Sequence, residues 1–73
     1  MPKLSPISAR KLLKILKQHG FMIVHQTGSH IRLSHPDGRK TSVPFHVGEK
    51  IGKGLLLAIL KDTNLTRDDV IKS

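Results

Sequence analysis

The feature that most restricts the fold of this chain is a change of hydrophobic period at Gly20. Before that glycine, apolar residues recur at the spacing of one helical face: Ala9, Leu12, Leu13 and Leu16. This spacing predicts an amphipathic helix over about Ala9–His19, with lysines and an arginine on its other faces. Ser8 is a suitable N-cap, and Gly20 can end the helix with a positive φ.

After Gly20 the pattern is that of β-strands. The segment from Phe21 to Thr27 is rich in apolar and β-branched residues, and His30–Ser34 alternates polar and apolar residues with a period of two. Gly28-Ser29 supplies a tight turn between them, and His35-Pro36-Asp37-Gly38 supplies a second turn. With a third strand at about Lys40–Pro44, the sequence predicts an antiparallel meander.

The remaining residues predict mainly helix. The stretch Phe45–Lys53 contains two glycines and is expected to be a loop, whereas Gly54–Lys61 is apolar enough for a second, buried helix. Thr66 and Asp69 have the spacing of a capping box at the start of a short terminal helix. The expected fold is therefore α+β in one domain, residues 1–73, with a three-stranded antiparallel sheet and two helices packed on one face.

This arrangement leaves the other face of the sheet to solvent. If Ile31 and Leu33 point toward the helices, then His30 and Arg32 point away from them. A domain of 73 residues has little interior for a deep substrate cavity. We therefore expect any ligand to bind on the surface, which favours a large and extended partner.

The charge of the chain indicates what kind of partner that is. Lysine and arginine number 13 against 5 aspartates and glutamates, a net charge of +8. Such a surface concentrates polyanions, above all nucleic acid, although an anionic membrane, an acidic protein or a basic protein that merely stays in solution would also fit. There is no apolar run long enough to span a membrane, no expected signal peptide and no cysteine, so the cytoplasm is the expected compartment.

Several nucleic-acid chemistries are disfavoured by residues that are missing. The five carboxylates are scattered over turns and helix ends, which argues against a two-metal nuclease. The only aromatic rings, Phe21 and Phe45, suit a core better than a base-stacking platform. The glycines near Lys53 lack the spacing of a phosphate-binding loop, and no histidine pair shows zinc-ligand spacing. No metal or cofactor is expected.

His30 is the candidate for chemistry. RNA carries its own nucleophile, the 2′-hydroxyl beside the scissile phosphate, so an enzyme must only remove that proton, protonate the leaving oxygen and stabilise the phosphoryl charge. An imidazole can accept or donate a proton near neutral pH. Arg32, Lys40 or Arg39 could stabilise the phosphoryl charge. By contrast, His19 is expected at a helix end, His35 in a turn and His25 at an ordinary strand position.

Four sequence elements resemble the HicA toxin family when taken in order. They are Gly20-Phe21 after the first helix, Gly28-Ser29-His30 at the hairpin, Val43-Pro44-Phe45-His46 after the third strand, and the helix from Gly54 through Ile59-Leu60-Lys61. Nearly the whole chain is covered, with Met1–Ile7 outside the match.

The resemblance implies a double-stranded-RNA-binding-like fold and the toxin of a type II toxin–antitoxin system. It further implies a metal-independent mRNA endoribonuclease, held inactive by a HicB-like antitoxin. In the family the histidine of the Gly-Ser-His motif is catalytic, which corresponds to His30, and His46 matches a recurring position of less clear role. Together with the charge pattern, the expected RNA-binding residues are Gly28, Ser29, Arg32, Lys40, His46, Lys50 and Lys53.

Two other functions fit the same residues. One is a small RNA-binding module without catalysis, which the fold and charge suit equally well. The other is an interaction protein that acts through an acidic partner, such as a co-repressor. Gly28 and Ser29 could serve turn geometry alone, and Lys50 and Lys53 could be solvated loop charges instead of phosphate ligands.

Overall fold

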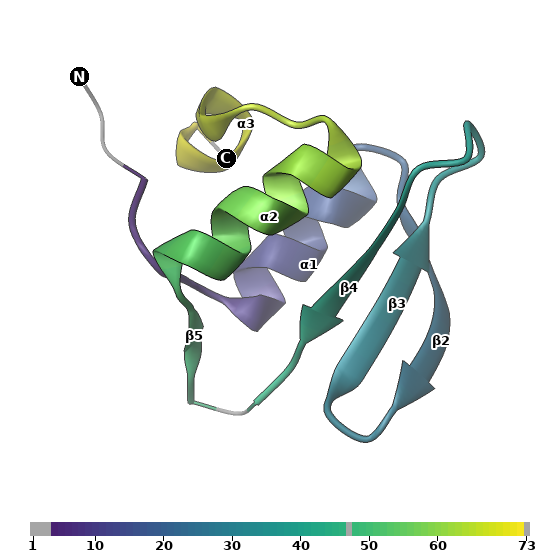
Figure 1. The fold of residues 1–73 in the computed structure, drawn as a ribbon, viewed down its shortest axis with the longest axis horizontal. Helices are drawn as coiled ribbons and strands as arrows, with labels where there is room; N and C mark the ends of the chain where they lie inside the picture. Colours follow the sequence, from purple (N-terminus) through teal and green to yellow (C-terminus); the bar gives the residue numbers. More distant parts are fainter. Residues whose placement is uncertain (1–3, 47, 73) are drawn as a thin grey trace.

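The computed structural model describes residues 4–46 and 48–72 of the chain (Figure 1). The expected order of a helix, three strands and two further helices is confirmed, with two short strands added. The elements are β1 (Ile7–Ser8), α1 (Ala9–Gln18), β2 (Met22–Thr27), β3 (His30–Ser34), β4 (Lys40–Pro44), β5 (Lys50–Ile51), α2 (Lys53–Thr63) and α3 (Arg67–Ile71).

Helix α1 begins and ends as its sequence predicts. The Ser8 hydroxyl accepts a hydrogen bond from the backbone N–H of Lys11 at 3.1 Å, which satisfies one of the unpaired amides of the first turn. At the other end, Gly20 has a φ of +93°, a conformation that a residue with a Cβ adopts at a cost. One face of the helix is buried, through Ala9, Leu12, Leu13, Ile15 and Leu16.

The prediction of a loop over Phe45–Lys53 is wrong in part. Lys50–Ile51 forms β5, which pairs antiparallel with β1, placing Ile7 opposite Ile51 and Ser8 opposite Lys50. Two residues are too few to show a period of two, so no local pattern predicts this ladder. The pairing ties the segment before α1 to the segment before α2, and it buries Ile51.

The main sheet has the order β2-β3-β4 and is antiparallel throughout. Ile31 and Leu33 of β3 and Thr41 and Val43 of β4 point into the core, where each is at most 7% exposed. Helices α1 and α2 both contact β4, and Figure 1 shows β3 and then β2 lying progressively farther from them. The expected α+β fold, with helices against one face of a three-stranded sheet, is confirmed.

Strand β2 is not packed against the helices. All six of its residues are exposed, including Met22 at 64% and Val24 at 62%. A β-bulge at Val24 shifts its register, so Ile23 lies opposite Leu33 while His25 lies opposite Arg32. Because of the bulge, Ile23 and His25 project to opposite faces of the sheet.

The C-terminal helix α3 completes the core. The Thr66 hydroxyl accepts a hydrogen bond from the Asp69 N–H, and the Asp69 carboxylate accepts one from the Thr66 N–H, so the predicted capping box is confirmed. Val70 is buried, and α3 packs near α1. Within the described residues, no helix has the length and apolar character needed to cross a bilayer.

Candidate functional site: the outer face of the sheet

The face of the sheet turned away from the helices gathers polar and basic side chains. His30 and Arg32 alternate with the buried Ile31 and Leu33, and both are exposed as the sequence predicts. On the neighbouring strand, Lys40 is exposed and lies opposite Ser34, while Ser42 lies opposite Arg32. Strand alternation alone thus brings these side chains to one surface.

Strand β2 adds two further polar residues to this outer face. Thr27 lies directly opposite His30 because the Gly28-Ser29 turn contains only two residues. His25, beyond the bulge, lies opposite Arg32. Its Nε2 is 2.6 Å from the Thr27 hydroxyl oxygen, which is a hydrogen bond between two exposed side chains of the same strand.

These residues surround a shallow depression. It has a volume of about 400 Å³ and is lined by His25, Thr27, His30 and Arg32. A second depression of about 640 Å³ also has His25 and Arg32 in its wall and extends toward Ser34, Lys40 and Ser42. Because the two share walls, they adjoin on the outer face, and an extended chain could lie across both.

The electrostatic character of the face suits a polyanion. None of the residues of β2, β3 and β4 is an aspartate or a glutamate, whereas Arg32 and Lys40 contribute positive charge. Over residues 4–46 and 48–72, no cluster of three or more histidine, cysteine or acidic side chains is placed to hold a metal ion. The chemistry available at this face is proton transfer by imidazole and charge stabilisation by guanidinium and ammonium groups.

The tight turn predicted at Gly28-Ser29 is confirmed, since it joins β2 to β3 directly before His30. Gly28 has a φ of +54°, a left-handed conformation that glycine adopts without steric cost. The Ser29 carbonyl accepts a hydrogen bond from the Phe45 N–H. This bond fixes the turn to the segment after β4, and so fixes where His30 begins its strand.

The other expected RNA-binding residues lie apart from the depression at His30. His46 is exposed and lines a different hollow, of about 170 Å³, together with Ser8 and Arg10 near the start of α1. Lys50 lies in β5, which pairs with β1 and not with the main sheet, and Lys53 is the first residue of α2. Both lysines are exposed.

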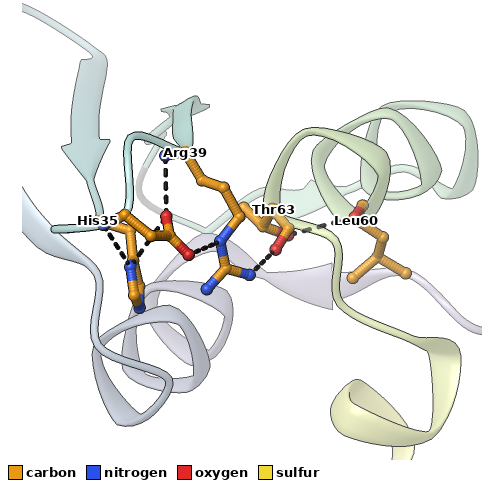
Figure 2. Close-up of polar contacts among 5 residues, drawn as sticks. His35, Arg39, Leu60 and Thr63 are labelled. Atoms are coloured by element: carbon orange, nitrogen blue, oxygen red, sulfur yellow. Dashed lines mark hydrogen bonds and ion pairs between the residues drawn. The ribbon is translucent and has the colours of Figure 1, made fainter.

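Arg39, which sequence reasoning offered as a possible phosphate ligand, is engaged elsewhere. Its Nε donates to the Asp37 carboxylate at 2.7 Å, its Nη1 donates to the Thr63 carbonyl, and its guanidinium carbon lies 5.1 Å from the centre of the Phe21 ring. Figure 2 shows this side chain reaching from the turn to the end of α2. Arg39 thus links the β3–β4 turn to the end of α2 and to Phe21.

Asp37 is the centre of the same turn. It accepts hydrogen bonds from the Arg39 backbone N–H, at 3.0 Å, and from the Arg39 side chain, and these bonds and the guanidinium charge hold the pKa of Asp37 below its ordinary value. His35 is a turn residue as predicted, but its ring also packs edge-on against Phe21, with centroids 5.0 Å apart. These contacts are structural and lie outside the depression at His30.

A comparison with protein families identifies the chain. The family model described as "HicA toxin of bacterial toxin-antitoxin" matches residues 9–65. The chain belongs to the HicA toxin family. The match begins at the first residue of α1 and ends just after α2, so it contains the whole outer face described above. A search among curated proteins found no match.

Membership gives this HicA chain a general role, that of a toxin whose partner is an antitoxin. The geometry of the outer face adds two residues, His25 and Thr27, that the sequence does not predict to be part of the site. The sequence predicts an ordinary strand position for His25 and no role in the site for Thr27. The sequence does contain a signal for Thr27, because a two-residue turn after Thr27 places it opposite His30 in a regular antiparallel ladder. The bulge at Val24, which decides the surroundings of His25, had no such signal.

Proposed function

We propose that this HicA toxin is a metal-independent endoribonuclease that cleaves mRNA, with His30 transferring a proton at the scissile phosphate. The observation that carries the proposal is an exposed imidazole on the outer face of the sheet, beside Arg32, on a sheet whose strands contain no aspartate or glutamate. Family membership supports a toxic activity, and the basic face suits a polyanionic substrate.

The reaction uses chemistry that RNA already contains. A base removes the proton of the 2′-hydroxyl, O2′ bonds to phosphorus, and the P–O5′ bond breaks as an acid protonates O5′. The products are a 2′,3′-cyclic phosphate and a 5′-hydroxyl. A positioned imidazole contributes one of these proton transfers, typically worth about 10²–10⁴ in rate. DNA lacks the 2′-hydroxyl, so this scheme predicts that DNA is bound but not cut.

The positive charges act on the phosphoryl oxygens. Arg32 is two residues from His30 on the same strand and has its side chain on the same face, and Lys40 lies across the adjoining depression. Charge that develops on the non-bridging oxygens is stabilised by such groups, because they are already in place before the reaction. Gly28 and Ser29 form the turn that presents His30. His46, Lys50 and Lys53 would bind RNA only at a distance from the depression.

We further propose that a HicB-like antitoxin holds the toxin inactive by covering the outer face, and that both proteins act in the cytoplasm. A HicB-like reading frame beside the gene would support this partner. A purified antitoxin that blocked cleavage and protected β2 and β3 from hydrogen exchange would establish where it binds.

The proposal is tested by the variant His30→Ala. His30 is exposed, so the variant should fold and bind RNA, yet lose cleavage by about 10²–10⁴-fold and lose growth arrest on induction. His19→Ala is the matched control, since His19 is also exposed but ends α1. Wild-type cleavage should persist in excess chelator.

Two results would contradict the proposal. If His30→Ala cut RNA at the wild-type rate, His30 would not be the catalytic residue. If the wild-type protein bound RNA in a salt-dependent way and left it intact, the chain would be a binding module without catalysis.

A further inference from the structure

Cleavage by the scheme above needs both a base and an acid, and His30 supplies only one of them. We propose that His25 is the second proton-transfer residue, so that the outer face carries a pair of histidines which act on the two sides of one phosphate. This inference rests on the proposed function, since it concerns the same reaction at the same depression.

The register of the hairpin places the two imidazoles together. His25 pairs with Arg32 and Thr27 pairs with His30, so His25 and His30 are diagonal neighbours on one face. Diagonal positions in an antiparallel pair are separated by about 7–8 Å, which is within reach of long and aromatic side chains. Both histidines line the same depression of about 400 Å³, together with the two residues opposite them.

The side chain of His25 is held by a hydrogen bond to Thr27 on the same strand. The Thr27 hydroxyl lies 2.6 Å from His25 Nε2, and both side chains are exposed on a strand that the helices do not cover. An imidazole has two ring nitrogens, so a hydrogen bond at Nε2 leaves Nδ1 for a substrate oxygen. Thr27 is thus a positioning residue, and it orients His25 at the position diagonal to His30 across the hairpin.

The pair completes the balance of protons. One imidazole, neutral at the start, takes the proton from O2′ as the O2′–P bond forms. The other, protonated at the start, gives its proton to O5′ as the P–O5′ bond breaks. Arg32 lies opposite His25 and two residues from His30, where its guanidinium can face the non-bridging oxygens. Proton exchange with water then restores both imidazoles.

The experiment measures the pH dependence of cleavage for wild type, His25→Ala, His25→Gln, His30→Ala and the control His19→Ala. The substrate is an RNA oligonucleotide with a linkage that the wild type cuts. The wild type should give a bell-shaped profile, with one limb for the base and one for the acid. In each variant of His25 or His30 the cleavage rate should fall about 10²–10⁴-fold. Each should also lose one limb of the pH profile, and the limb that is lost should differ between the two positions. Glutamine keeps a polar side chain but transfers no proton, so His25→Gln should fail as alanine does.

A second substrate separates the two roles. An oligonucleotide with sulfur in place of O5′ at the same linkage has a leaving group that departs without a proton, because a thiol is far more acidic than an alcohol. This substrate should restore cleavage to one of His25→Ala and His30→Ala, whichever lacks the acid, and should leave the other inactive.

The outcomes distinguish this inference from the proposed function. If His25→Ala cleaved RNA at the wild-type rate while His30→Ala was inactive, only the role of His25 would be overturned. A loss in His25→Ala that came from weaker affinity for a 2′-deoxy analogue, with both limbs of the pH profile retained, would have the same consequence. An inactive wild type, or a fully active His30→Ala, would instead overturn the proposed function and this inference with it.

Discussion

The location of bound RNA is open to a quantitative test through salt dependence. Removing two phosphate contacts should weaken the salt dependence of binding by a calculable amount, because each contact on a single strand contributes about 0.7 to the slope of log K against log salt. On the outer face the two exposed cations are Arg32 and Lys40. The double variant Arg32→Ala/Lys40→Ala should therefore lower the slope by about 1.4.

The size of the effect follows from that slope. Between 50 and 200 mM salt, a fourfold change, one contact accounts for about 2.6-fold in affinity and two account for about 7-fold. Wild-type affinity should thus fall about 7-fold further than that of the variant over this range. Both side chains are exposed, so the substitutions should change the free energy of unfolding by no more than about 0.5 kcal/mol each.

The assay is fluorescence anisotropy with a labelled single-stranded RNA, in a His30→Ala background that leaves the RNA uncut. Two other double variants remove the same charge from different surfaces. Lys14→Ala/Lys17→Ala changes the exposed side of α1, and Lys50→Ala/Lys53→Ala changes the region around β5.

The α1 variant should keep the wild-type slope. An equal loss of slope in all three double variants would show that RNA responds to the overall charge of +8 and not to this face. A loss confined to the β5 variant would place the RNA backbone at Lys50 and Lys53, and the assignment of the outer face would be refuted.

Three other predictions concern positioning and stability. Thr27→Val should lower kcat and leave RNA affinity unchanged, because it removes the hydroxyl that holds His25, and Thr27→Ser should restore activity; equal loss in both variants would contradict that role. Gly20→Ala should destabilise the protein by about 1–2 kcal/mol in urea unfolding, since Gly20 has a φ of +93° and a Cβ there would meet the His35 ring at 2.8 Å. Gly54→Ala, in α2 with no atom near the added Cβ, should cause no loss, and a similar loss in both would refute the argument. The pKa values of Asp37 and Asp69 are lowered by hydrogen bonds from the neighbouring backbone. The ionised carboxylates therefore stabilise the folded protein at pH values above the ordinary pKa of 3.8, and this stabilisation is lost as the pH falls below that value. The difference in unfolding free energy between wild type and Asp37→Asn or Asp69→Asn should therefore shrink between pH 7 and pH 3, and a constant difference would contradict this linkage.

Local sequence patterns determined much of this protein. The period of 3.6 before Gly20, the two-residue turn at Gly28-Ser29 and the period of two through His30–Ser34 each depend on neighbours in the chain. They therefore predicted α1, the hairpin and the exposure of His30 correctly. The capping box at Thr66 was predicted for the same reason, since both of its hydrogen bonds lie within four residues.

The tertiary structure alone decided the features that depend on distant segments. Pairing of β1 with β5 joins residues more than forty positions apart, and Arg39 is drawn from the candidate site by the Thr63 carbonyl at the end of α2. The bulge at Val24 sets which β2 side chains face outward, and so brings His25 to the same depression as His30. Such choices depend on the free energy of burying surface and pairing backbone across the whole fold, which no local window of sequence contains.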